Sequence, residues 1–221
     1  MFPLDLERRR KQNLASPRQD ARGVAPSIRS FALAIDRQRQ GIERIPVLAG
    51  ARGDLVRVCA ALDEAEVAAI AFSLDDPQAE LVRFQEAARA ASVPVLRVDL
   101  LLEEFQIYQS RVAGADAVLL QAGAVSHELL ARLAQAAKST HMAACIACAS
   151  RDELERVAPI GPAVIALPPS LLHLPVPPRT LVLALSDGPE LRGRADALLD
   201  EAVGAAAEPA VAFRAALEKD S

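Results

Sequence analysis

The sequence predicts an α/β protein in which eight strand–helix units form one closed parallel sheet. Short apolar runs alternate with amphipathic stretches along most of the chain. Continuous apolar runs indicate strands that are buried on both faces, as in a parallel sheet covered by helices. Eight such units are typical of a (β/α)8, or TIM, barrel, for which roughly 200 residues is near the lower limit. The alternative is an open doubly wound sheet, which would usually have fewer strands and a glycine-rich first turn.

The elements follow in order from a polar, basic arm. We expect residues 1–27 to form this arm, with one short helix, and residues 28–221 to form a single barrel domain. Ser27 can cap a helix over 27–40 whose apolar residues share one face, and we expect that helix outside the barrel. The apolar runs predict strands at 45–49, 68–74, 93–98, 117–121, 142–146, 163–167, 181–185 and 196–199. The amphipathic stretches predict helices at 54–66, 77–91, 102–113, 127–138, 150–157 and 205–218.

Two of the eight units are short of helix-forming sequence. The segment after the sixth strand, PPSLLHLPVPPR, contains too many prolines for a full helix. The segment after the seventh strand, DGPELRGRA, allows at most one or two turns. We therefore expect shortened sixth and seventh helices.

Composition excludes several classes of protein. The net charge of −4 argues against a nucleic-acid partner and against a basic membrane-binding surface. No apolar run approaches the roughly 20 residues of a membrane span, and the first residues contain no apolar signal-peptide core. Three cysteines do not make a disulfide framework. These observations predict a cytoplasmic protein that binds neither nucleic acid nor membrane.

One segment resembles a known family. PVLRVDLLLEEFQIYQSRVAGADAVLL, residues 94–120, is similar to the third-to-fourth strand region of indole-3-glycerol phosphate synthase, a (β/α)8 enzyme of tryptophan biosynthesis. In that family the region reads P-V-L-R-K-D-F, then Y-Q-I, then G-A-D-A-V-L-L. ELERV at 153–157 and SIRSFALAI at 27–35 extend the likeness. The resemblance implies a barrel preceded by an extra helix.

The same resemblance implies that the catalytic residues are missing. The family enzyme closes an indole ring with loss of CO2 and water, using a lysine general acid at strand 3, a glutamate at strand 5 and an asparagine at strand 6. These positions match Val98, Ala147 and Pro168 here. The strand-1 carboxylate and second lysine are also absent from VLAGARG. The only lysines, Lys11, Lys138 and Lys219, do not lie at a predicted strand end.

Anion binding is the property that could survive. By the same resemblance, Ser186 and Gly188 retain part of a phosphate site after strand 7, whereas Asp200 replaces a glycine after strand 8. A carboxylate there would repel a phosphate. Arg52, in the loop after strand 1, is the one nearby cation that we can propose. A small phosphorylated ligand or a protein partner is therefore possible, and no cofactor is expected.

The remaining polar residues form no nucleophile–base pair. We expect Ser73, Asp99, Gln121, Ser186 and Asp200 to line the barrel mouth, with Arg97 pointing away from Asp99. Cys145 and Cys148 lie along one strand, where residues three apart face opposite sides, so neither a redox pair nor a metal site is expected. Three histidines are far apart in sequence, without acids at ligand spacing, namely His127, His141 and His173.

Three functional hypotheses follow. The first is a non-catalytic family member with a binding, regulatory or scaffold role. The second is an active synthase, a carbon–carbon lyase, whose catalytic residues lie elsewhere in the alignment. The third is a barrel with different chemistry at the same mouth. The missing lysine and glutamate at the strand ends favour the first hypothesis.

Overall fold

The computed structural model describes residues 6–15, 18–36, 41–188 and 191–220, and they form a closed barrel. Eight parallel strands pair in chain order, and β8 returns to pair with β1. The strands are β1 (Glu43–Ala49), β2 (Ile70–Ser73), β3 (Val95–Val98), β4 (Ala117–Gln121), β5 (Ala143–Ala147), β6 (Val164–Leu167), β7 (Leu181–Ala184) and β8 (Ala197–Asp200). The predicted (β/α)8 barrel is confirmed, including its first and last strands.

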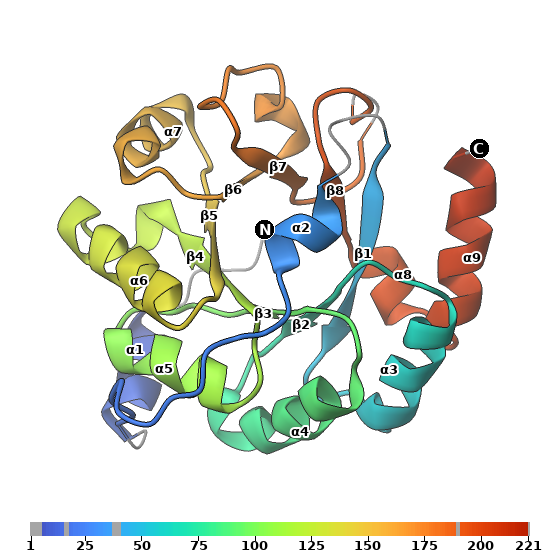
Figure 1. Cartoon of the computed structure of the whole chain (residues 1–221), viewed down its shortest axis with the longest axis horizontal. Coiled ribbons are helices and arrows are strands. Elements are labelled where there is room, and N and C mark those ends of the chain that lie inside the picture. The colour runs from blue at the N-terminus through green and yellow to red at the C-terminus, as the bar shows by residue number, and fades with distance from the viewer. Residues whose placement is uncertain (1–5, 16–17, 37–40, 189–190, 221) are drawn as a thin grey trace.

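Helices surround the strands on the outside (Figure 1). They are α3 (Leu55–Glu64), α4 (Pro77–Ala90), α5 (Glu104–Val112), α6 (His127–Ser139), α7 (Arg151–Val157), α8 (Glu201–Ala205) and α9 (Pro209–Asp220). Short 3-10 turns are η1 (Ala122–Ala124), η2 (Ala158–Ile160) and η3 (Pro169–Leu171). The helix expected at 205–218 corresponds to α9, which begins later, at Pro209, and the short helix α8 before it was not expected.

The wall is thinnest after β6 and β7, as the sequence predicts. Only η3 follows β6, and the described residues between β7 and β8 contain no helix. Leu172, Leu174 and Leu191 of these connections are buried and belong to the same apolar cluster as the outer faces of β7 and β8. Three leucines in irregular chain thus replace the apolar stripe of a helix.

The barrel interior is filled by small and medium aliphatic side chains. Alternate residues of each strand form one buried cluster, because successive strand residues face opposite sides of the sheet. Its members from the strands are Ile45, Val47, Ala71, Leu96, Val98, Ala117, Leu119, Cys145, Ala147, Val164, Ala166, Leu183, Ala197 and Leu199, and Ala69 joins them just before β2.

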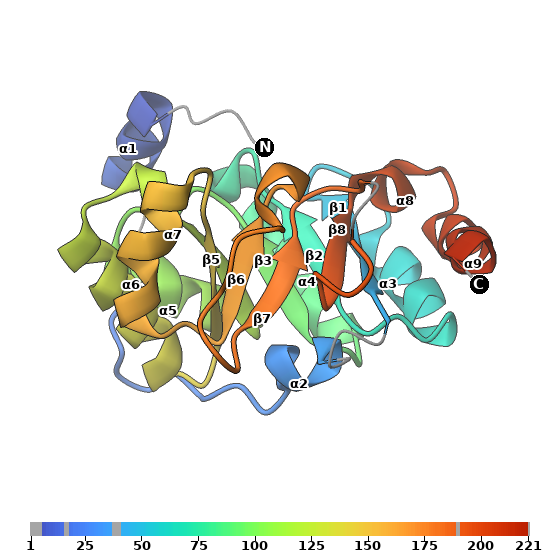
Figure 2. The same ribbon diagram turned by 90° about the horizontal axis from the view of Figure 1, so that it is seen from above.

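A short helix closes the N-terminal end of the barrel. Helix α2 (Phe31–Ile35) packs Phe31 and Ile35 into the interior cluster, and Figure 2 shows it on the side opposite to α1 (Leu6–Ala15) and α8. The extra N-terminal helix predicted over 27–40 is therefore present but shorter, and it covers the end of the barrel rather than its side, while 37–40 lie outside the described residues. Ser30 caps α2, whereas the hydroxyl of Ser27 donates to Asp116.

Asp116 ties this N-terminal segment to the barrel. Its buried carboxylate accepts the backbone N–H of Val95 at 3.0 Å, which lies at the start of β3. It also forms ion pairs with Arg29 at 2.8 Å and with Arg111 of α5 at 2.9 Å. Asp196, before β8, accepts the N–H of Val182 in the same way at 2.8 Å. The aspartates before β4 and β8 thus each accept an amide N–H near the start of the preceding strand.

We expect Asp116→Ala to destabilise the fold by about 3 kcal/mol, because two arginines would lose the carboxylate that compensates them. Urea unfolding of both proteins measures this difference. Asp20→Ala is the matched control, since Asp20 is exposed and its carboxylate bonds only to Arg22 within the described chain. A change at Asp116 no larger than that at Asp20 would contradict the role given to the network.

Candidate functional site at the barrel mouth

The C-terminal ends of the strands define the mouth, where (β/α)8 enzymes carry their active sites. Val98 and Ala147 face inward there and belong to the interior cluster. Ser73 pairs with Val98 in the β2–β3 register, and Gln121 pairs with Ala147 in the β4–β5 register. Ser73 and Gln121 continue the inward alternation of Ala71 and Leu119, as expected from the sequence. None of these four inward side chains at the strand ends is an acid or a base.

Pro168 follows β6 and begins the 3-10 turn η3. Its ring has neither a side-chain donor nor an N–H group. Gly188, after β7, packs against this turn, because a Cβ added to Gly188 would lie 2.9 Å from Cβ of Pro169. The two connections on this side of the barrel thus meet through apolar contacts.

Asp99 does not line the mouth, contrary to the expectation from sequence. It forms an ion pair with Arg97 at 2.6 Å, and both side chains are fully buried. Arg97 also donates to the hydroxyl of Ser110 at 3.1 Å, which places the pair between β3 and α5. The prediction that Arg97 points away from Asp99 was wrong, because residues two apart in an extended segment share a face.

Asp200 is also directed away from the barrel axis. One carboxylate oxygen accepts the N–H of Val203 and caps α8, and the other pairs with Arg44 of β1 at 2.6 Å. Arg44 lies 3.6 Å from the exposed carboxylate of Asp187 as well. From the sequence, Arg52 was the only cation expected near Asp200. The structure shows that the cation paired with Asp200 is Arg44 instead. The charge of Asp200 is compensated within the wall.

Two of the three proposed anion-binding residues, Arg52 and Gly188, are engaged in local structure. Arg52 donates to three backbone carbonyl groups, those of Gly204, Ala206 and Ala207, at 2.8–3.1 Å. It therefore holds the turn between α8 and α9. The N–H of Gly188 donates to the side chain of Asp187 at 2.8 Å, and Ser186 is exposed. Two of the donors that a phosphate would need, the Arg52 guanidinium and the N–H of Gly188, are therefore already engaged.

The cysteines and histidines do not converge. Cys145 lies inside the barrel and Cys148 outside it, as their spacing predicts. Burial, and secondly the nearby carboxylate of Glu153, raises the pKa of Cys148 to about 12, so its thiol stays protonated. His127 begins α6 after the capping Ser126, while His141 precedes β5 and His173 follows η3. The described residues contain no group of three metal-ligating side chains.

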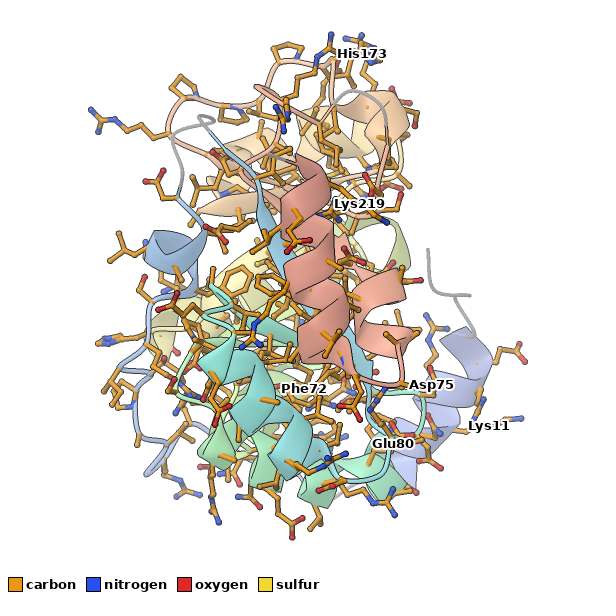
Figure 3. The ribbon with its side chains drawn as sticks, turned by 90° about the vertical axis from the view of Figure 1, so that its right-hand side faces the viewer. Lys11, Phe72, Asp75, Glu80, His173 and Lys219 are labelled. Atoms are coloured by element: carbon orange, nitrogen blue, oxygen red, sulfur yellow. The ribbon has the colours of Figure 1, made fainter. Side chains whose placement is uncertain are left out.

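Glu80 is an acid that sequence reasoning missed. It lies on the buried face of α4 together with Phe84 and accepts the N–H of Asp75 at 3.0 Å (Figure 3). A Cβ added to Gly50, just after β1, would come within 2.6 Å of its carboxylate. Burial raises the pKa of Glu80 above its usual value. The signal was an acid at an apolar position of the 77–91 helical pattern.

One described cavity opens beside the mouth. Its volume is about 660 Å³, and it lies between α1, the loop after β3 and the turn η1. Leu102, Val125 and Leu129 supply its apolar lining, and Glu103 and Arg10 supply charge. This volume suits a small ligand.

Comparison with known proteins places this barrel in a family. The family model described as indole-3-glycerol phosphate synthase matches residues 53–168, just over half of the chain. The chain belongs to the indole-3-glycerol phosphate synthase family. The match begins after β1 and ends at Pro168, so it leaves out β7, β8 and the residues proposed for phosphate binding.

Relatives named indole-3-glycerol phosphate synthase share moderate identity with the chain. The protein of Neisseria meningitidis serogroup C is 36% identical over 101 residues, or 45% of this chain and 39% of the relative. That of Chlorobium phaeovibrioides is 29% identical over 174 residues, or 74% of this chain and 67% of the relative. The chain therefore spans about two fifths of the Neisseria relative and two thirds of the Chlorobium relative.

Solved structures share the fold at low identity. Orotidine 5'-phosphate decarboxylase of Pyrococcus horikoshii has a TM-score of 0.61 at 13% identity, covering 77% of this chain and 96% of the other. A chain of the Pyrococcus furiosus tryptophan synthase complex has a TM-score of 0.59 at 15% identity, covering 80% and 95%. At these identities the likeness shows the barrel fold alone.

The described part of this family member contains no helix with the length and hydropathy of a membrane span.

The raised pKa of Glu80 predicts how stability depends on pH. A carboxyl group whose folded pKa exceeds its unfolded pKa destabilises the fold when ionised, so stability falls as pH rises through the unfolded and then the folded value. We expect Glu80→Gln to stabilise the protein at about pH 7 and to make little difference at about pH 3, where the acid is neutral. Urea unfolding at both values measures this, with the exposed Glu155→Gln as control. A gain that is equal at both pH values would contradict it.

Proposed function

We propose that this chain is a cytoplasmic member of the indole-3-glycerol phosphate synthase family that does not catalyse ring closure and instead binds a ligand or partner. The observation that carries this proposal is the identity of the inward strand-end side chains. The positions aligned with the family's lysine, glutamate and asparagine hold Val98, Ala147 and Pro168. A reaction that expels water needs a proton donor, and these three side chains cannot donate a proton.

Electrostatics at the mouth support the same proposal. The buried acid nearest to Val98 in sequence is Asp99, and its charge is neutralised by Arg97 on the outer face of β3. Asp200 is neutralised by Arg44 in the same manner. Neither carboxylate is directed at the barrel axis. These two carboxylates near the strand ends therefore form ion pairs within the barrel wall and are not available to a reacting group at the mouth.

The cavity between α1 and the loops after β3 and β4 supports a binding role. Arg10 reaches it from α1, and its guanidinium has no hydrogen bond or ion pair among the described residues. The backbone of η1 and the N-terminal end of α6 border the same space. A small phosphorylated ligand would find a cation and an apolar wall there.

A second candidate function is supported by the names of the relatives. The family match and the relatives favour an active synthase, a carbon–carbon lyase, that uses side chains other than those aligned here. Glu80, with its raised pKa, is the acid that such an enzyme could use. A barrel with different chemistry would also have to rely on such an unaligned group.

The two candidates differ in a direct assay. We expect the purified chain to convert no anilino-ribulose phosphate to indole-glycerol phosphate above a control without protein. Loss of one general acid alone lowers a rate by about 10²- to 10⁴-fold, and here three groups are missing. Val98→Lys should not restore turnover, because Ala147 would still replace the glutamate. Turnover by the native chain that disappears in Glu80→Gln would establish the second candidate instead.

Phosphate affinity provides a separate test. We expect weak or no binding of inorganic phosphate at the β7–β8 side, because Arg52 and the N–H of Gly188 are already engaged. Asp200→Asn keeps a side chain that can cap α8 but removes the negative charge beside Arg44. Calorimetric titration should therefore show tighter binding by this variant, on the order of fivefold for loss of one nearby like charge.

Glu155→Gln is the control for this titration, because it removes an exposed carboxylate of α7 that contacts neither Arg44 nor Gly188 in the described structure, and it should leave phosphate binding unchanged. Tight binding by the native chain, or weaker binding by Asp200→Asn, would show that the phosphate site aligned after β8 is misplaced.

A further inference from the structure

A second cavity lies on the side of the barrel opposite to the mouth. Its volume is about 620 Å³, within the range of small-molecule sites. The chain segments that form it are the C-terminal half of α6, the start of β5, and the loops that enter β6 and β7. All of these segments precede strands, so the cavity opens on the N-terminal side, where α2 lies in Figure 2.

The walls of this second cavity, called the groove from here on, are mostly apolar. Pro162, Pro177 and Pro178 contribute rigid rings, and Ile160 and the buried Met142 contribute aliphatic surface. The remaining apolar lining consists of alanines, which leave the space open. The loops that enter β6 and β7 form this groove, and only the short 3-10 turn η3 follows β6 in the adjoining layer.

Two cationic side chains line the groove and are not paired with an acid in the described chain. Lys138 and Arg179 are exposed, and neither side chain has a hydrogen bond or ion pair within the described chain. The groove lining contains no aspartate or glutamate. This is a local excess of positive charge on a protein whose net charge is −4. A ligand that complements the groove is therefore anionic at one end.

Arg179 occupies a backbone conformation that favours glycine. Its φ is +65°, in the left-handed region, where an L side chain is strained. Glycine would be the more stable residue at this turn. The arginine therefore contributes its guanidinium to the groove at a cost in stability, which is common at binding sites.

We propose that this groove binds a small amphiphilic carboxylate, with its head group at Lys138 and Arg179 and its apolar body between the prolines and Met142. The planar fork of arginine suits a carboxylate, and the lysine adds a second positive charge. The apolar walls favour a hydrocarbon body over a highly charged ligand. The site is separate from the mouth and does not depend on the function proposed there.

Binding of decanoate to the full chain tests the proposal. We expect saturable binding by calorimetry, with shifts in the NMR signals of Met142 and Ala144. The double variant Lys138→Gln/Arg179→Gly should weaken binding about tenfold, as loss of two exposed ion pairs implies. Glycine suits the backbone at 179, so this variant should fold at least as stably as the native chain.

Arg132→Gln is the matched control for charge. Arg132 lies on the same helix, α6, but pairs with Glu104 at 3.1 Å and does not line the groove. This variant should bind decanoate like the native chain. Equal weakening by Arg132→Gln and by the double variant would overturn the proposal, since it would indicate a general effect of net charge.

A second pair of measurements tests the apolar part. Ala131→Leu, on the groove face of α6, should reduce decanoate binding by filling space while keeping a helix-favouring residue. Decyltrimethylammonium, which has the same tail and the opposite charge, should not bind. Binding of both probes with equal affinity would overturn the proposal, as would a groove that binds an acidic peptide and no decanoate.

Discussion

The ion pair between Arg97 and Asp99 fixes which residue the third strand presents to the barrel mouth. Both side chains are fully buried on the outer face, where Ser110 of α5 holds the guanidinium. Breaking such a pair would leave an uncompensated buried charge, so the strand cannot shift by one residue. Val98, between the two, must therefore face the axis. By the resemblance, this is the position at which the family has a lysine, and in this chain it carries an isopropyl group.

Other charged side chains in the barrel wall are also paired with nearby groups. Asp200 pairs with Arg44, Asp116 pairs with Arg29 and Arg111, and Arg52 binds carbonyl groups at the end of α8. Arginine suits these roles because it stays charged and donates in several directions. Charges near the strand ends thus stabilise connections between elements, and the axis is left to Ser73, Gln121 and aliphatic groups. The family match ends at Pro168, before the part of the wall in which loops replace helices.

The sequence predicted the architecture because strands buried on both faces produce continuous apolar runs, and eight runs favour closure. The resemblance to the family placed Val98 and Ala147 at strand ends, and Ser73 and Gln121 were expected at the mouth. The sequence did not predict partners that are far apart in the chain. Arg44 and Asp200 are separated by 156 residues, and Ser27 and Asp116 by 89, so spacing carries no sign of either contact. Because Ser27 bonds to Asp116, it does not cap α2, and the helix begins only after Ser30. The direction of Arg97 was predictable from strand alternation and was assigned wrongly.

The central claim is that a barrel of this family can keep its frame and lose its chemistry. Growth of a tryptophan-requiring bacterium tests this claim most directly, because selection detects even slow ring closure. The strain would lack its own indole-3-glycerol phosphate synthase and would express this chain, with an active family member on the same plasmid as control. The account predicts colonies without tryptophan for the control and none for this chain at equal expression. Colonies that depend on expression of this chain would contradict it.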